Sequence, residues 1–246
     1  MRLALLADIH GNREALEAVL ADIAQRKIDR IVILGDIVGY DPDPEWCADK
    51  TMALVAAGAI AVKGNHDSGI ADRGEGMNAI ARAALDWTRP RLSQTQRDFL
   101  AGLPMTASLD DALFVHASAN DPADWIYVTS ERSAMPGFRV SRARLIFCGH
   151  VHVPALFTCD RAGTVRGQKV TTGTPVPLLR SRRWMAVIGS VGQPRDGVPH
   201  AAYAIHDGAT NEVTFRRVPY DAETTARKTH EAGLPETLAL RLLRGS

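Results

Sequence analysis

Five short apolar segments of this sequence each end in residues that can bind a metal ion. The endings are Asp8-Ile9-His10 after LALLA, Gly35-Asp36 after IVIL, Gly64-Asn65-His66-Asp67 after AIAVK, His116 after ALFV, and Gly149-His150-Val151-His152 after LIFC. In open α/β sheets, ligands bind just outside the carboxyl ends of the strands. If these segments are strands, their ends meet at one edge, and we predict a single polar cluster there.

The residue types in this cluster favour hydrolysis at a pair of divalent metal ions. The predicted ligands are Asp8, His10, Asp36, Asn65, His116, His150 and His152. Imidazole mixed with carboxylate and amide oxygens favours manganese, our first expectation, or iron, zinc, cobalt or nickel over calcium. The absence of Cys ligands argues against a structural zinc site. Two ions about 3.5–4 Å apart can hold a phosphate and lower the pKa of a bridging water, so that a bridging hydroxide attacks phosphorus.

Alternation along an extended chain gives further expectations about the same motifs. Asp8 and His10 are two residues apart, so they should point the same way and share one ion. His66 follows Asn65 and should point to the opposite side. It is therefore our candidate for the general acid, or for a group that stabilises the leaving oxygen.

The hydrophobic pattern predicts alternating strands and helices in the first two-thirds of the chain and mainly strands afterwards. We expect helices at 13–26, 44–58, 78–88, 94–102, 221–232 and 234–244, and later strands near 153–158, 164–171, 184–189, 201–206 and 212–218. Asp207-Gly208 predicts a hairpin turn. Strand–helix alternation predicts a largely parallel sheet, and the later strands predict a second sheet packed on it. The segment 119–143 has little pattern and is expected to be a loop near the site.

Several residues outside the cluster are candidates for substrate contact. Arg195 and Arg13 could each contact a phosphate, although a turn or a solvated helix surface explains either of them as well. Trp125 and Tyr127, within the segment 119–143, could stack on a base.

The five motifs, in this order, resemble those of the calcineurin-like metallophosphoesterases, whose signature is D-x-H, G-D, G-N-H-[DE], an isolated H, and G-H-x-H. The resemblance covers residues 1 to about 152, and GSVGQPRDG (189–197) is similar to a glycine-rich strand of small prokaryotic members. It implies one domain over 1–246, with 221–246 as a C-terminal helical extension. The implied fold is an α/β (α+β) four-layer sandwich of two mixed sheets flanked by helices.

The resemblance also implies the division of the ligands between two metal ions. One ion would be held by Asp8, His10, Asp36 and His152, and the other by Asp36, Asn65, His116 and His150. Asp36 would then bridge the two ions.

One departure from the family pattern bears on the substrate. Serine/threonine protein phosphatases of the superfamily carry G-D-x-V-D-R-G, whereas this chain has Gly39 and Tyr40 in place of the last Asp and the Arg. Asp67 or Asp41 could take over the task of orienting His66, and we count Asp67 among the catalytic candidates. Small phosphodiesters, phosphomonoesters or nucleotides are therefore favoured over phosphoproteins. A dinucleoside polyphosphate hydrolase is the alternative enzyme, and a non-enzymatic scaffold is disfavoured by the complete ligand set.

Composition sets limits on partners and location. The chain has 246 residues, 46% hydrophobic and 23% charged, with a net charge of +1. This composition supports a folded core, and the small net charge predicts no stable binding to nucleic acid or membranes. No apolar run approaches the roughly 20 residues of a membrane span. Three Cys without a C-x-x-C pair favour a reducing, cytoplasmic location. The sequence does not predict an oligomeric state.

Overall fold

Strand β1 (Arg2–Leu6) shows why the chain forms layers. Its side chains alternate between the two faces of a sheet, and the residues after the first are buried. Leu3 and Leu5 pack in an apolar cluster with Phe147 of a second sheet. Leu6 points the other way and packs in a cluster with Leu16 of a covering helix. A strand that is apolar on both faces needs a cover on each side, which the second sheet and the helices supply.

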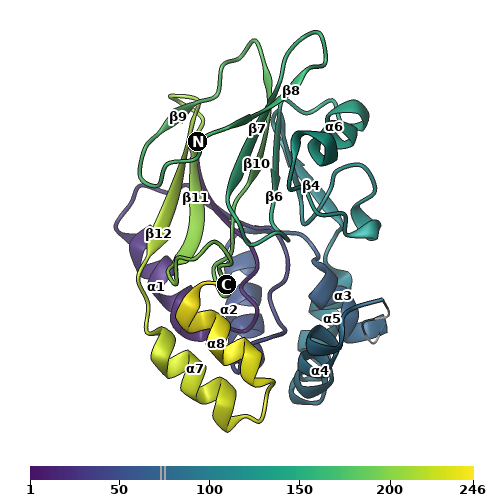
Figure 1. The fold of residues 1–246 in the computed structure, drawn as a ribbon, viewed down its shortest axis with the longest axis vertical. Coiled ribbons are helices and arrows are strands. Elements are labelled where there is room, and N and C mark those ends of the chain that lie inside the picture. Colours follow the sequence, from purple (N-terminus) through teal and green to yellow (C-terminus); the bar gives the residue numbers. More distant parts are fainter. Residues whose placement is uncertain (73, 75) are drawn as a thin grey trace.

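The computed structural model describes residues 1–72, 74 and 76–246, and these contain two six-stranded mixed sheets (Figure 1). The first sheet runs, in spatial order, β3 (Ile60–Ala61), β2 (Arg30–Ile33), β1, β11 (Ala201–Asp207), β12 (Glu212–Val218) and β9 (Val176–Pro177). The second runs β4 (Thr106–Leu109), β5 (Ala112–Val115), β6 (Leu145–Cys148), β10 (Arg183–Val187), β7 (Ala155–Cys159) and β8 (Val165–Gln168). With helices on the outer faces, this arrangement confirms the α/β four-layer sandwich.

Eight α-helices flank the sheets in the described part of the chain. They are α1 (Arg13–Ala24), α2 (Pro44–Ala56), α3 (Asn65–Asp72), α4 (Ala79–Thr88), α5 (Gln94–Gly102), α6 (Glu131–Val140), α7 (Ala222–Glu231) and α8 (Glu236–Arg244). Helix α1 packs on β11 and β12, whereas α6 covers the second sheet, where Phe138 joins a cluster with Met185 (Figure 1). None of these helices has the length and apolarity that a bilayer-spanning segment requires.

Strand pairing differs from the sequence prediction in one important way. β1, β2 and β3 are parallel neighbours, and so are β5, β6 and β10. However, β11 lies antiparallel to β1, so the C-terminal hairpin β11–β12 joins the first sheet. β5 and β6 instead belong to the second sheet. The prediction of one largely parallel N-terminal sheet and a separate C-terminal sheet is therefore wrong, because long-range pairing mixes the two halves of the chain.

The remaining elements agree with the sequence prediction except at six places. The predicted helices and strands are present with ends shifted by a few residues, apart from the strand at 59–63, of which only β3 is regular. The elements not predicted are β4, β9, α3 and α6, the last inside the expected loop 119–143. Residues 189–197 form a loop and not a strand.

Asp22 of α1 joins the helix to the first sheet, and its ionisation should be measurable in stability. Arg26 donates two hydrogen bonds to Asp22, and the hydroxyl of Tyr203 on β11 donates another. The bonds from Arg26, followed by that from Tyr203, lower the pKa of Asp22 to about 2. The stabilisation is thus present above the unfolded-state pKa of about 3.9 and is lost as the pH falls toward 2.

Asp22→Asn should lower the free energy of unfolding by about 1–3 kcal/mol at pH 7, because hydrogen bonds to a charged group are lost. The difference from wild type should shrink between about pH 4 and pH 2. Chemical denaturation at several pH values measures both. Glu17→Gln, on the exposed side of α1 in an i,i+4 pair with Arg13, is the control and should cost about 0.5 kcal/mol or less. A pH-independent deficit in Asp22→Asn would contradict the electrostatic explanation.

Candidate metal centre

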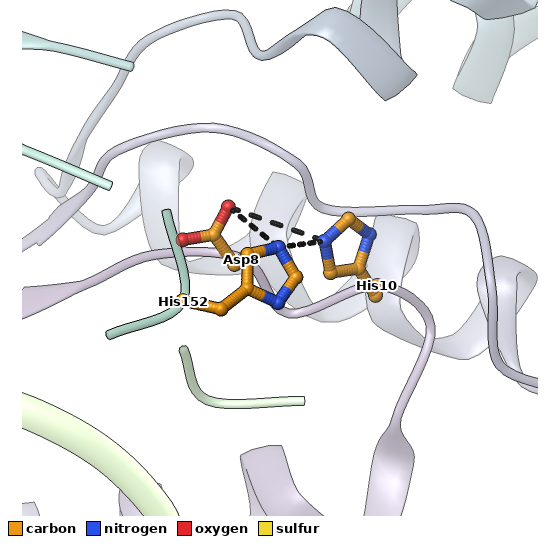
Figure 2. A group of neighbouring side chains, drawn as sticks. All are labelled: Asp8, His10 and His152. Carbon is orange, nitrogen blue, oxygen red and sulfur yellow. Dashed lines mark hydrogen bonds and ion pairs between the residues drawn. The ribbon is translucent and has the colours of Figure 1, made fainter. Parts of the chain in front are cut away.

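Side chains that follow β1 and β6 form the first of two donor groups at one edge of the sheets. Asp8, His10 and His152 each place a donor atom within 4.8 Å of the others (Figure 2). Nε2 of His10 lies 3.1 Å from Nε2 of His152, and Oδ1 of Asp8 lies 3.5 Å from the same His152 atom. Figure 2 shows the carboxylate and both rings turned toward one another. Two imidazole nitrogens and a carboxylate oxygen are a common donor set for first-row divalent metals.

The second group comes from the ends of β2, β3, β5 and β6. Donor atoms of Asp36, His116 and His150 lie within 4.8 Å of one another. Nε2 of His116 is 3.1 Å from Nδ1 of His150 and 3.1 Å from Oδ1 of Asn65. The structure therefore brings all seven predicted ligands together in two adjacent groups.

Asp36 lies between the two groups. Its Oδ2 is 3.6 Å from Nε2 of His10 in the first group and 3.4 Å from Nε2 of His116 in the second. A carboxylate in this position can serve two ions at once, which is the geometry that a bridging ligand requires.

The outward-facing nitrogens of two histidines are held by backbone carbonyls. Nδ1 of His116 bonds the carbonyl oxygen of Leu34 at 2.7 Å, and Nδ1 of His152 bonds that of Gln193 at 2.6 Å. Ligating histidines typically donate their other ring N–H in this way, which fixes the tautomer and leaves Nε2 as the ligand atom. In addition, Nε2 of His150 is buried and has no hydrogen-bond partner in the part of the chain that the structure describes. The donor set thus fits a metal centre.

The backbone turns sharply at the donors. Five of the seven have positive φ, between 55° and 68°: Asp8, His10, Asp36, His150 and His152. Asp8 and His10 are therefore not on an extended segment, and the argument from strand alternation was wrong even though both side chains enter the same group. Left-handed conformations of non-glycine residues store strain and gather at functional sites.

Burial and mutual charge shift the pKa values of these groups in opposite directions. Burial raises the pKa of Asp8 to about 8. Burial would also raise that of Asp36, but the imidazoles led by His116 outweigh it and hold the pKa well below its usual range. Burial likewise opposes protonation of His116, yet Asp36 and Asp8 raise its pKa to about 9. Burial lowers the pKa of His10 and His152 well below the usual range, so both are neutral, as ligands must be.

Comparison with known proteins agrees with this geometry. The model of the calcineurin-like phosphoesterase superfamily domain matches residues 1–211. The chain belongs to this superfamily. An uncharacterised protein of Methanocaldococcus jannaschii is 32% identical over 252 residues, covering 99% of this chain and 98% of that protein. A metallophosphoesterase from Sphaerobacter thermophilus, known as a crystal structure, has 38% identity and a TM-score of 0.88, covering 100% and 99% of the two chains.

A shorter match covers the N-terminal motifs. The phosphodiesterase YfcE of Escherichia coli is 41% identical over 75 residues, which are 28% of this chain and 41% of YfcE. Because the chain belongs to a phosphoesterase superfamily, it is a hydrolase by family. Its clustered Asp and His side chains could hold metal ions.

Asp67 holds the loop that carries Asp36. Its Oδ2 accepts hydrogen bonds from the backbone N–H groups of Asp36 and Gly64, and its Oδ1 accepts from those of Ile37 and Val38. No hydrogen bond joins Asp67 to the ring of His66 among the described residues. Asp67 therefore acts on the position of Asp36, and the expectation that it orients His66 has no contact to support it.

Asp41, the other candidate for orienting His66, is buried. Neither of its carboxylate oxygens has a hydrogen-bond partner in the described chain. Burial raises the pKa of Asp41 well above its usual range. Among the described residues, no hydrogen bond therefore joins Asp41 to the His66 ring.

The ring of His66 is held by packing. Residues 65–72 form helix α3, so His66 projects from a helical turn and not from an extended chain, as the sequence had suggested. Its ring centroid is 4.3 Å from that of Tyr40 and 4.7 Å from that of His10. A Cβ at Gly39 would lie 2.3 Å from Nδ1 of His66, so only glycine leaves room for the ring. Gly39 and Tyr40, which depart from the protein phosphatase pattern, thus shape the place of His66.

The two arginine candidates lie in different surroundings. Arg13 pairs with Glu17 at 2.9 Å and lies over the ring of Trp46, so α1 and α2 hold it. The backbone N–H of Arg195 bonds the carbonyl oxygen of His152, and its guanidinium lies 5.5 Å from the ring centroid of Tyr40. Only Arg195 is placed beside the donor groups.

A cleft of about 470 Å³ opens beside the second donor group. Asn65, His66 and His150 line it, together with the aromatic side chains of Trp125 and Tyr127. The Tyr127 ring stacks on His150, with centroids 4.1 Å apart. The segment 119–143 therefore contributes to the site, as expected, and it presents aromatic faces to whatever occupies the cleft.

Sequence reasoning took 189–197 for a glycine-rich strand and missed that the loop 188–193 supports Asp8, just after β1. Oγ of Ser190 donates to the carbonyl oxygen of Asp8 at 2.8 Å, and the N–H of Gly192 donates to the same oxygen. A Cβ at Gly192 would lie 1.9 Å from the carbonyl oxygen of Ile9, so the loop needs glycine there. The glycines of the segment were the available signal.

Asp67→Asn distinguishes the two roles considered for Asp67. The amide nitrogen cannot accept the backbone N–H bonds, and each buried N–H left unpaired costs about 1–3 kcal/mol. We expect a lower melting temperature and substoichiometric metal by elemental analysis, because the Asp36 loop loses its anchor. If Asp67 served His66 alone, metal content and melting temperature would stay at wild-type values while kcat fell.

Gly39→Ala should displace His66, because the added methyl group overlaps the ring. Turnover should fall about 100-fold or more if His66 assists the reaction. Gly58→Ala is a matched control: Gly58 also has positive φ, 102° against 94°, but a Cβ there meets nothing within 4 Å. It should cost about 1 kcal/mol of stability and leave turnover unchanged. Equal activity loss in both variants would assign the effect to backbone strain.

Proposed function

We propose that this chain hydrolyses small phosphoesters at a dinuclear metal centre. The position of Asp36 supports this proposal most directly, since its Oδ2 faces Nε2 of His10 on one side and Nε2 of His116 on the other at nearly equal distances. A single metal ion would need only one of the two donor groups. Manganese remains our first expectation, with iron, zinc, cobalt and nickel as alternatives.

The chain's own residues can be given parts in the reaction. Divalent ions at this site would polarise a phosphoryl oxygen and supply a nucleophile from water at neutral pH. Hydrolysis forms a P–O bond to the water oxygen and breaks the P–O bond to the leaving group, whose oxygen must gain a proton. His66 borders the cleft beside the donors, so it is placed to donate a hydrogen bond or a proton to that oxygen.

The cleft suggests where the organic part of the substrate lies. Trp125 and Tyr127 offer apolar faces next to Asn65 and His66, which suits a base or another flat group. Phosphodiesters, phosphomonoesters and nucleotides fit this cleft, in agreement with the partial match to a protein named as a phosphodiesterase. A dinucleoside polyphosphate hydrolase is the second candidate.

Two other functions are less well supported. Protein phosphatase activity would lack the Asp and Arg that Gly39 and Tyr40 replace. A non-enzymatic scaffold would not require a complete donor set around a cleft. We also expect the reaction to take place in a reducing compartment such as the cytoplasm, because Cys47, Cys148 and Cys159 are all buried free thiols.

His66→Gln tests the proposed chemistry. The variant should bind as much metal as wild type, because all seven predicted ligands remain. However, kcat should fall about 100-fold or more for a substrate with a poor alkoxide leaving group. The fall should be smaller for p-nitrophenolate, which needs little help to depart. Rates are measured on bis-p-nitrophenyl phosphate and an alkyl phosphodiester with added Mn²⁺. Unchanged rates on the alkyl ester would remove His66 from the reaction, and metal-loaded wild type that is silent on all esters would favour the scaffold.

A further inference from the structure

Helix α8 reaches the edge of the metal centre from the C-terminal end of the chain. Leu238 is fully buried in an apolar cluster with Tyr40, whose ring packs on His66 and His10. Arg241 lies three residues later and therefore on the same side of the helix. In Figure 1 the end of α8 approaches the middle of the molecule, below the strands of both sheets.

The loop that carries Arg195 is tied to the end of the same helix. The N–H of Gly197 donates to the carbonyl oxygen of Gly245 at 2.7 Å, and the N–H of Gly245 donates to that of Arg241. The guanidinium of Arg195 lies over Tyr40, the residue beside which α8 packs. Helix register and this tie thus put Arg241 on the side of α8 that packs beside Tyr40, the residue over which Arg195 lies.

Neither of these guanidinium groups is neutralised. Among the described residues, no carboxylate lies within ion-pair distance of Arg195 or Arg241, although eight other arginines have one. Asp196, the neighbour of Arg195, forms an ion pair with Arg217. Within the described chain the guanidinium of Arg195 donates to the side chain of Gln193, and its Nε is buried without a partner.

The proximity of the two charges is unfavourable in the free protein. Burial lowers the pKa of the Arg241 guanidinium, and the charge of Arg195 lowers it further. Two cations held together by a rigid helix end and a tied loop form a site in which an anion relieves the repulsion. Arginine pairs of this kind suit the several oxygens of a phosphate.

We propose that Arg195 and Arg241 bind a second phosphoryl group of the substrate, next to the one held at the metal centre. Arg195 lies beside the first donor group, because its backbone N–H bonds the carbonyl oxygen of His152, whereas the aromatic cleft borders the second group. A substrate can therefore extend from the cleft, across the metals, to the arginines. This inference rests on the proposed function and narrows it to compounds with two or more linked phosphates, such as nucleoside diphosphates and dinucleoside polyphosphates.

The test compares binding of one phosphate with binding of two. Manganese-loaded protein is titrated calorimetrically with inorganic phosphate and with methylenediphosphonate, a non-hydrolysable diphosphate, at constant free Mn²⁺. Wild type should prefer the diphosphonate. Arg241→Gln should weaken binding of the diphosphonate by roughly tenfold or more, because one charge-assisted contact is lost. It should change the affinity for inorganic phosphate less than twofold. Arg241→Lys should restore part of the loss.

Arg244→Gln is the matched control, because Arg244 lies on the same helix and is exposed; it should leave both affinities unchanged. Melting temperatures of all variants check the fold. Equal weakening of both probes would mean that Arg241 contacts the first phosphate, and no weakening would mean that it contacts neither; either result, or a wild type without preference, overturns the proposal. Failure of the proposed function is distinct: it would appear as absent hydrolysis of every ester, whatever the calorimetric preference.

Discussion

The structure depends on the burial of seven polar side chains that face one another at the carboxyl ends of five strands. Six of them are at most 5% exposed, and Asn65 is partly buried. Buried ionisable groups are stable only when they are paired, hydrogen-bonded or bound to a metal. Here carboxylate oxygens lie 3.4–4.0 Å from imidazole nitrogens, and His10 and His152 nitrogens lie 3.1 Å apart. Nδ1 of His10 and Nε2 of His150 have no hydrogen-bond partner among the described residues. A cluster of this kind satisfies its own members poorly, which is the arrangement expected when cations complete it.

Backbone hydrogen bonds around the donors stabilise their left-handed conformations. The N–H groups of Asp8 and His10 bond the carbonyl oxygens of Gly35 and Asp36 on the neighbouring loop. The side chain of Asp67 then fixes the latter loop from the other side. Each left-handed donor residue is thus held by hydrogen bonds in the adjacent loop, so one loop cannot shift without the next. This coupling explains how positive φ values can persist at five donors.

Local sequence patterns predicted the donors, most strands and the helices that cover the first sheet, because apolar periodicity and capping residues are local signals. Asn12, for example, is a residue type that caps helices, and it caps α1. The partition of strands between the sheets could not be read, since pairing of β1 with β11 joins residues about 200 apart. Helix α6 escaped notice because it contains Pro136 and few large apolar residues, although Ser130 and Ser133 form a capping box. The role of Asp67 was hidden for a different reason: its partners are backbone N–H groups, which leave no trace in residue types.

Asn12 connects the metal-binding loop to the C-terminal part of the chain. Its amide donates to the carbonyl oxygen of Gly192 at 2.7 Å and, at 3.3 Å, to the hydroxyl of Tyr220, while its oxygen accepts from Thr225 of α7. Lys228, one turn further along α7, bonds both Glu14 and Asp43 at the beginnings of α1 and α2. Helix α7 is therefore fixed to the residues that immediately follow the first motif.

These contacts assign more than a covering role to the last 35 residues, which lie beyond the part of the chain that the superfamily model matches. Helix α7 is hydrogen-bonded to Asn12, just after the first motif. Helix α8, which carries Arg241, packs against Tyr40. The donors themselves come only from the matched region. If both proposals hold, the metal ligands and the substrate preference come from different segments, and a change in the C-terminal helices would alter which phosphoesters bind while the metal ligands stay the same.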